Sequence, residues 1–293
     1  MSDPGRARQR LLPRWVLLVA LLPGLLALLP QGYGVYKQAP PGRVFLGFRH
    51  AVKDHASYMG LAKSAARHGG VTIRNPYTTE PHDGRMVMLH LLAVGQLSAI
   101  TGLSQLFAWY ALGALAAWIF FLLAWRVVVA MIEAPRWRRV TYLLICFGGG
   151  LEWPLFLAEG SALTTYARAQ PATSLHSYWT MFGAAQMPMW LAGYALVLCA
   201  FLLALRRPRL MVQLLGGGLL LLAAFWTHPY TGLAALPVLG LLGVLPMLAP
   251  LWRWKLPDGY EVRAYLPLVG TVLIAAAGIG AFAWWARQDP VYA

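Results

Sequence analysis

The sequence predicts an all-α fold, a polytopic transmembrane helical bundle of about seven spans, from two observations. Of the 293 residues, 59% are hydrophobic and only 12% are charged, which is about half the charged share of a typical soluble domain. Apolar runs of about 18 or more residues, each able to cross a ~30 Å hydrocarbon core, recur along the chain. This pattern excludes soluble enzyme folds, secreted disulfide scaffolds and disordered chains.

The expected spans follow the apolar runs and the basic segments beside them. The first, at 16–30, comes directly after an arginine-rich N-terminal stretch. Pro23 and Pro30, together with the lack of a small-residue cleavage site, favour a retained anchor with a cytoplasmic N-terminus over a cleaved signal peptide. The other expected spans lie at 106–125, 140–158, 188–205, 210–227, 231–250 and 265–286.

Residues 86–102 are apolar but are interrupted by His90, Gln96 and other polar residues, as in a partly hydrated helix. If this helix spans, the basic segment 136–139 lies outside. If the helix is re-entrant or interfacial, that segment lies in the cytoplasm, and the positive-inside rule favours this second topology. The long first loop, 31–105, with its amphipathic juxtamembrane helices, then faces outward, as do all seven histidines.

The charge balance points to the lipid bilayer as the partner of the chain. The net charge of +14 arises largely from basic segments beside the spans, which are ordinary topology signals. We therefore expect no nucleic-acid partner. We interpret 1–293 as a single transmembrane domain.

The outer loop contains a predicted amphipathic helix at 51–68, which should end at the glycine pair 69–70. Asp54 and Tyr58 are four residues apart, so they share one face of this helix. Near a bilayer, burial can raise the pKa of a carboxyl group towards that of a working base. The alternative is an ion pair of Asp54 with Lys53 or Arg49 on a solvated helix. A separate stripe at helical spacing suits packing on a membrane or on other helices: Val52, His55, Met59, Ala62 and Ala66.

The segment 75–84 reads NPYTTEPHDG, which is rich in turn-forming dipeptides and lacks periodicity. Glu80, His82 and Asp83 within it resemble a small metal-ligand cluster. A flexible, proline-rich turn without fixed geometry is the alternative, with these side chains solvated or capping. A divalent metal cofactor is therefore a candidate without support, and no cofactor is predicted.

Further candidates lie near the outer ends of later spans. Glu152 follows three glycines at the end of the third expected span, where a carboxylate is either functional or simply reaches the interface. His228, in the sequence WTHPY, either points into a cavity or lies at the interface. The aromatic loop 159–187 is either an interfacial belt or a lipid groove. Gly216–Gly218 predict close helix packing.

Several of these segments resemble the GT-C glycosyltransferases, which are polytopic enzymes that use lipid-linked sugars. The resemblance lies in the D-x-x-x-Y setting of Asp54, the segment NPYTTEPHDG, the helix ending AVGQLSAITGLS, and the segments FGGGLEW (147–153) and THPYTGLAALP (227–237). The sequence is similar to a poorly characterised bacterial branch of this family. The D-x-D metal motif of some members is absent.

The resemblance implies transfer of a sugar from a polyprenyl-phosphate donor to an acceptor on the outer face of a bacterial inner membrane. Asp54 is then the expected catalytic base. Arg74 and Arg85 are the expected phosphate contacts, because a guanidinium binds phosphate in bidentate fashion. Tyr58, together with Glu152 and His228, completes the expected donor-binding set.

The rival interpretation is a non-enzymatic membrane protein, such as a lipid or solute transporter or an assembly partner. Helices broken by Gly and Pro suit a transporter, but such folds contain two related halves, and the sequence has no evident internal repeat. Because family members commonly extend further, we also expect the chain to be either an N-terminal fragment or a short member.

Overall fold

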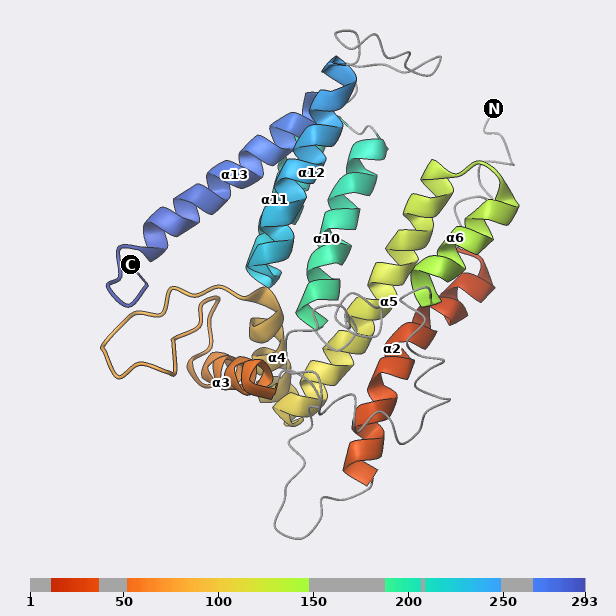
Figure 1. Ribbon diagram of the computed structural model, residues 1–293. Helices are drawn as coiled ribbons and strands as arrows, with labels where there is room; N and C mark the ends of the chain where they lie inside the picture. Colours follow the sequence, from red (N-terminus) through yellow and green to blue (C-terminus); the bar gives the residue numbers. More distant parts are fainter. Residues whose placement is uncertain (1–11, 37–51, 148–187, 207–208, 249–265, 293) are drawn as a thin grey trace, which may run out of the picture. The chain divides into compact units, whose positions relative to one another are not determined.

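A computed structural model of the protein describes residues 12–36, 52–147, 188–206, 209–248 and 266–292 (Figure 1). These residues are mostly helical, and their one β-feature is an isolated antiparallel bridge between Ile73 and Met86. The all-α prediction is therefore confirmed. The helices follow in the order α2 (Arg14–Tyr36), α3 (Val52–His68), α4 (Leu89–Thr101), α5 (Gln105–Met131), α6 (Pro135–Phe147), α10 (Pro188–Leu205), the π-helix η2 (Val212–Gly216), α11 (Gly217–Thr227), α12 (Pro229–Leu248) and α13 (Leu266–Ala286).

Four of the described helices are long and apolar enough to cross a bilayer, namely α5, α10, α12 and α13. They indicate a multi-pass membrane protein. The last three lie within two residues of the spans expected at 188–205, 231–250 and 265–286.

The other three expected spans are not established among the described residues. The apolar stretches Arg14–Leu26 and Val212–Thr227 are shorter than 18 residues. Helix α6 ends at Phe147, and the rest of the span expected at 140–158 lies outside the described residues. The structure therefore supports a bundle with four candidate spans and several shorter apolar helices.

The chain divides into two compact units: Met1–Val52 with Gly113–Pro188, and Lys53–Leu112 with Met189–Ala293. In the first unit, aromatic rings join α2, α5 and α6. The Trp15 ring meets Trp125 and Tyr142 edge-on, at centroid distances of 5.1 and 5.8 Å. Such edge-to-face pairs stabilise beyond their buried area.

In the second unit, α10 to α13 form one group of helices around small and branched apolar residues (Figure 1). The close-packing role predicted for Gly216–Gly218 is confirmed at two positions. A Cβ atom on Gly217 would come within 2.7 Å of the Thr271 Cγ2 atom, and one on Gly218 within 2.7 Å of Ile274. Any larger side chain there would force α11 and α13 apart.

The helix expected at 210–227 is not regular throughout. Residues Val212–Gly216 form a π-helical turn, and α11 begins directly after it. The Thr271 hydroxyl of α13 lies 3.1 Å from the Gln213 carbonyl oxygen and 2.9 Å from the Pro267 carbonyl oxygen, and its single hydrogen is shared between them. This side chain therefore supplies a donor to a backbone carbonyl in the irregular turn.

The amphipathic helix predicted at 51–68 is confirmed as α3, which begins at Val52 and ends at His68. Gly69 and Gly70 follow with φ of 66° and 83°, the left-handed conformation that ends helices. Helix α4 crosses α3 at Gly95, where an added Cβ atom would collide with the Ala62 carbonyl oxygen. This crossing fixes α3 against the rest of the second unit.

The segments that contain the described candidate site residues lie at one end of the second unit. In Figure 1 the chain alternates in direction through α10, α11, α12 and α13. The start of α10, the end of α11, the start of α12 and the end of α13 therefore share one end of this group. Helices α3 and α4 and the segment 69–88 lie at that same end.

Candidate functional site

Asp54 and Tyr58 lie one turn apart on α3, as predicted, and their side chains interact. The Asp54 side chain is exposed, whereas the Tyr58 ring is partly buried and stacks on Trp109 with 6.0 Å between centroids and 16° between planes. Burial raises the pKa of the Tyr58 phenol, and the Asp54 carboxylate and Tyr230 raise it further. Tyr58 is therefore a protonated hydrogen-bond donor beside a carboxylate.

Beneath this pair lies a buried cluster of imidazole and indole rings. Trp109 has no exposed surface. The rings of His55 and His90 meet it edge-on, at centroid distances of 5.6 and 5.3 Å. His55 is 3% exposed, so its predicted place in the packing stripe is confirmed. The cluster holds the Asp54–Tyr58 turn against α4 and α5.

His90 departs from the sequence-based expectation. We expected a partly hydrated helix at 86–102, but His90 is only 6% exposed, and burial lowers its pKa to about 4. Its Nε2 atom and the Trp109 Nε1 atom are buried without a hydrogen-bond partner among the described residues. Burying these two polar atoms without hydrogen bonds lowers the stability of the folded protein. The sequence pattern did not predict the burial of His90, because it does not show that His90 lies on the side of α4 that faces the protein.

His228 caps the start of α12. Its backbone is extended, with φ −151° and ψ 103°, as expected for a residue before proline. Its Nδ1 atom accepts hydrogen bonds from the Thr231 backbone N–H at 3.3 Å and the Thr231 hydroxyl at 2.7 Å. Burial lowers the His228 pKa to about 4, and the positive end of the helix dipole favours the same neutral form. The proton of neutral His228 is therefore on Nε2.

The His228 ring is surrounded by aromatic rings, with centroids 5.4 Å from Trp190 and 5.6 Å from Tyr230. Because Tyr230 raises the pKa of Tyr58, the two phenols lie within electrostatic reach. The structure therefore brings together two predicted candidates, the Asp54–Tyr58 pair and His228, from distant parts of the sequence. Tyr230 was not predicted, although it lies in the THPYTGLAALP segment.

The two arginines predicted to contact phosphate have different environments. The Arg85 guanidinium donates to the Trp285 carbonyl oxygen at 2.6 Å and lies over the Trp285 ring at 5.3 Å. Its Nε atom is 4.0 Å from the Asp289 carboxylate. Arg85 therefore attaches the loop to the end of α13. Arg74 instead lines a pocket beside α3.

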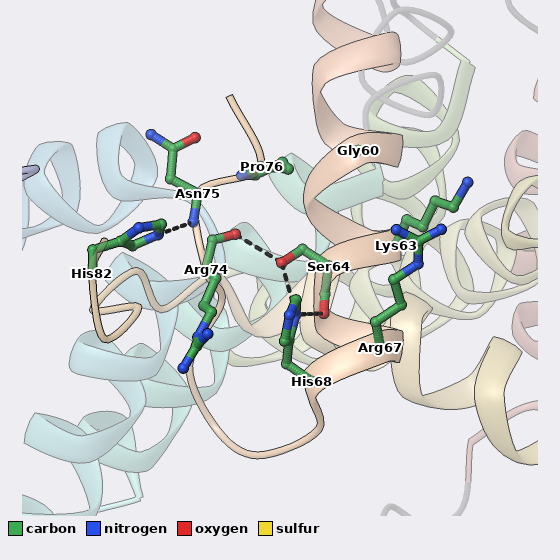
Figure 2. Close-up of a pocket in the computed structure, with 9 residues that line it drawn as sticks. All are labelled: Gly60, Lys63, Ser64, Arg67, His68, Arg74, Asn75, Pro76 and His82. Atoms are coloured by element: carbon green, nitrogen blue, oxygen red, sulfur yellow. Dashed lines mark hydrogen bonds between the residues drawn. The ribbon is translucent and has the colours of Figure 1, made fainter. Parts of the chain in front are cut away.

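This pocket, of about 420 Å³, lies between α3 and the segment 74–82 (Figure 2). The Ser64 hydroxyl donates to the Arg74 carbonyl oxygen at 2.8 Å, and the His68 Nδ1 atom bonds to the Ser64 carbonyl oxygen at 2.9 Å. Figure 2 shows Lys63 and Arg67 on one side of Ser64 and His68, with Arg74 and His82 on the other. The pocket is lined by Gly60, Lys63, Ser64, Arg67, His68, Arg74, Asn75, Pro76 and His82.

The segment 75–84 forms turns without a helix or strand, as predicted, and hydrogen bonds hold it on α3. The Tyr77 hydroxyl donates to the Ser57 carbonyl oxygen at 2.8 Å, and it fits over Gly60, where any Cβ atom would collide with it. The Asn75 backbone N–H donates to His82 Nε2 at 2.9 Å. Turn-forming residues thus dock on α3 through hydrogen bonds that a periodicity analysis does not detect.

The metal-ligand hypothesis for Glu80, His82 and Asp83 gains no geometric support. Both ring nitrogens of His82 are engaged, Nε2 by Asn75 and Nδ1 by the Glu80 carbonyl oxygen at 2.9 Å. In the described part of the chain, no group of three His, Cys, Asp or Glu side chains is placed to hold a metal ion.

Two remaining candidates, Glu152 and the aromatic loop 159–187, lie outside the described residues. Their expected roles stay predictions.

Comparisons of the chain with protein-family models, with curated proteins and with solved structures gave no match. The functional argument therefore rests on the geometry of the second unit and on the sequence resemblance.

Proposed function

We propose that this chain is a membrane glycosyltransferase that moves a sugar from a polyprenyl-phosphate donor to an acceptor on the outer face of a bacterial inner membrane. One observation supports this above the others. Tyr58 on α3, one turn from Asp54, lies within electrostatic reach of Tyr230, whose ring lies beside His228, at one end of the second unit. A carboxylate, a protonated phenol and aromatic rings at that end suit binding and activation of a sugar or its acceptor.

The proposed reaction is a direct displacement at the anomeric carbon. The acceptor hydroxyl gives its proton to the Asp54 carboxylate while its oxygen bonds to that carbon. The bond from the carbon to the phosphate oxygen breaks, and polyprenyl phosphate leaves with the electron pair. The exposed Asp54 side chain can reach a bound acceptor, and its neighbour Tyr58 keeps its proton and can donate a hydrogen bond.

The surrounding rings have complementary roles in this proposal. Tyr230 is 78% exposed, so one ring face is available to contact the apolar face of a sugar. Neutral His228 carries its proton on Nε2 and can donate to a sugar hydroxyl. Its Nδ1 atom is already occupied by Thr231, which fixes the ring orientation.

Transfer of labelled sugar from polyprenyl-phosphate donors, measured in membranes that contain the protein, tests the proposal. We expect transfer by the wild type and a large loss in Asp54→Asn. Glu80→Gln is the matched control, because Glu80 is an exposed carboxylate of the same loop. Transfer at the wild-type rate by Asp54→Asn would remove the base assignment. Absence of transfer by the wild type from every donor tried would favour the non-enzymatic interpretation.

A further inference from the structure

His82 closes the segment 75–84 on itself through both nitrogen atoms of its ring. The Nδ1 atom lies 2.9 Å from the Glu80 carbonyl oxygen, and the Nε2 atom lies 2.9 Å from the Asn75 backbone nitrogen (Figure 2). A carbonyl oxygen only accepts hydrogen bonds, and a backbone N–H only donates them. Nδ1 must therefore carry the proton and Nε2 must accept, so the two contacts together require the neutral ring in one tautomer.

A proton on Nε2 removes one of these two bonds. An imidazolium ring carries a hydrogen on each nitrogen, so Nε2 becomes a donor that faces the Asn75 N–H. The bond from Nδ1 to the Glu80 carbonyl oxygen persists. The bond from Asn75 is replaced by a contact between two donors, and the Asn75 N–H loses its acceptor in a half-buried place.

The bond that would be lost lies where this segment docks on α3. The carbonyl oxygen of the residue before Asn75 accepts from the Ser64 hydroxyl at 2.8 Å. Two residues after Asn75, the Tyr77 hydroxyl donates to the Ser57 carbonyl oxygen at 2.8 Å. Asn75 therefore lies between the two hydrogen bonds to α3, and a displacement of its backbone disturbs both.

His68, which lines the same pocket beside α3, shows the contrasting geometry. Its Nδ1 atom lies 2.9 Å from the Ser64 carbonyl oxygen, so Nδ1 donates. This donation is the same in the neutral and the protonated ring. A proton on His68 therefore breaks none of its hydrogen bonds, and this residue is a matched control for His82.

The charged groups around His82 come from α3, from the loop and from the end of α13, and their signs nearly balance. Among the described residues, four cations face three carboxylates, so the acceptor geometry at Nε2 distinguishes the two charge states of the ring better than net charge does. The ring of Tyr292 meets the His82 ring edge-on at 5.9 Å. The titratable and charged groups are Lys63, Arg67 and His68 from α3, Arg74, Glu80, Asp83 and Arg85 from the loop, and Asp289 after α13.

We propose that His82 is an acid-sensitive latch, which holds the segment 75–84 closed on α3 when the ring is neutral and loosens it at Asn75 when the ring is protonated. Histidine is the side chain whose ordinary charge change lies between pH 5 and 8. Because proton binding and closure exclude each other, closure is present at higher pH and is lost as the pH falls through that range. The latch does not depend on glycosyl transfer by the Asp54 site.

Hydrogen exchange of the Asn75 amide in the purified full chain tests the latch. Exchange is measured in detergent at about pH 7.5 and about pH 5.5, on either side of the ordinary histidine titration, and is corrected for the intrinsic rate at each pH. Protection should fall about fivefold at the lower pH, the factor that corresponds to one ordinary hydrogen bond. His90 and His228 stay largely neutral at both values, because burial lowers the pKa of each to about 4.

The Ile73 amide is the internal control for a local change. Ile73 is fully buried, and its N–H donates to the Met86 carbonyl oxygen at 2.7 Å without the participation of a histidine. Its protection should be the same at both pH values. Equal losses at Ile73 and Asn75 would show a general opening of the segment and overturn the latch, and so would unchanged protection of Asn75.

Two variants of His82 assign the pH response to its ring. His82→Gln supplies an amide oxygen that can accept from Asn75, whereas His82→Ala supplies no acceptor. Protection of Asn75 should be high at both pH values in the first and low at both in the second, so neither should respond to pH. His68→Gln should respond like the wild type. Thermal unfolding shows that each variant is folded. A wild-type response in either His82 variant, or its loss in His68→Gln, would overturn the proposal.

Discussion

Two faces of α3 differ in how their polar groups are held. Tyr58 lies over a buried cluster of rings around Trp109 and stacks directly on that indole, and Asp54 is exposed one turn before it. Arg67 and Lys63 instead extend beside a wall of hydrogen-bonded loop. On the first face, ring stacking holds Tyr58 in place. On the second face, hydrogen bonds between uncharged groups hold the loop beside Lys63 and Arg67.

This difference has a chemical meaning. A base that must meet a reacting atom needs a fixed position, because small misplacements cost large factors in rate. Stacked rings supply that rigidity beneath Tyr58. Lys63, Arg67 and Arg74 are long, exposed side chains beside a hydrogen-bonded loop. In the proposed function, the base therefore lies on the packed face.

The largest expected effect comes from removing the base. Asp54→Asn should lower sugar transfer by about 10²–10⁴-fold, the usual contribution of a positioned base. Transfer is measured at matched expression of the variant and the wild type. Glu80→Gln and Asp83→Asn should have much smaller effects on transfer, and comparable losses in all three would contradict the assignment.

The packed face should also be sensitive to acid. The pKa of His90 in the folded protein is about 4, below the ordinary value of about 6.5 for an unfolded chain. The unfolded chain therefore binds a proton first as pH falls, and stability present above about pH 6.5 is lost progressively down to pH 4. The full loss is about 3 kcal/mol for this one group.

Thermal unfolding in detergent across this pH window checks the acid effect. His90→Leu should reduce the pH dependence without abolishing it, because His228, whose pKa burial also lowers to about 4, titrates in the same window. A slope in His90→Leu equal to that of the wild type would contradict the prediction.

The crossing of α3 and α4 supports both faces, so overpacking it should disturb both. An added methyl group at Gly95 would meet the Ala62 carbonyl oxygen and the Ala65 Cβ atom. Gly95→Ala should destabilise the protein by about 1–3 kcal/mol. Gly280→Ala is the control, because nothing lies within 4 Å of its added Cβ atom. A Tm for Gly95→Ala equal to that of the control would contradict a tight crossing.

The sequence predicted the elements whose pattern is local. Helix α3, its glycine stop and the spans α10, α12 and α13 follow from apolar periodicity and run length, and these are properties of neighbouring residues. The π-helical turn at Val212–Gly216 was not predicted, because it depends on packing against Thr271 of a distant helix. The docking of Tyr77 on α3 was missed for the same reason.

The candidate site was predictable in part. Asp54 with Tyr58 followed from four-residue spacing, and His228 from its place before a proline at a helix boundary. Their proximity depends on the arrangement of distant segments, which spacing cannot give. The intramolecular partners of Arg85, Trp285 and Asp289, lie some 200 positions away in the chain, so spacing could not predict them. The phosphate contact expected of Arg85 stays a prediction.

The smallest expected effect concerns that attachment of the loop to the end of α13. Asp289 is 5% exposed, accepts from the Asp83 backbone N–H at 3.3 Å and lies 4.0 Å from Arg85. Asp289→Asn removes the charge and should cost about 1 kcal/mol or less, because the pair is long and Arg85 keeps Trp285. Hydrogen exchange of the backbone amides at 82–85 should become faster. Asp83→Asn is the matched control, since the Asp83 backbone rather than its carboxylate makes the contact.

This last change separates the two faces once more. A second pocket of about 410 Å³ lies between the loop and the end of α13, and it shares Arg74 and His82 with the pocket beside α3. Sugar transfer should be unaffected by Asp289→Asn, because Tyr58 is held by its stacking on Trp109 and not by Asp289. A loss of transfer without faster exchange at 82–85 would contradict this separation and would show that Asp289 supports the Asp54 face.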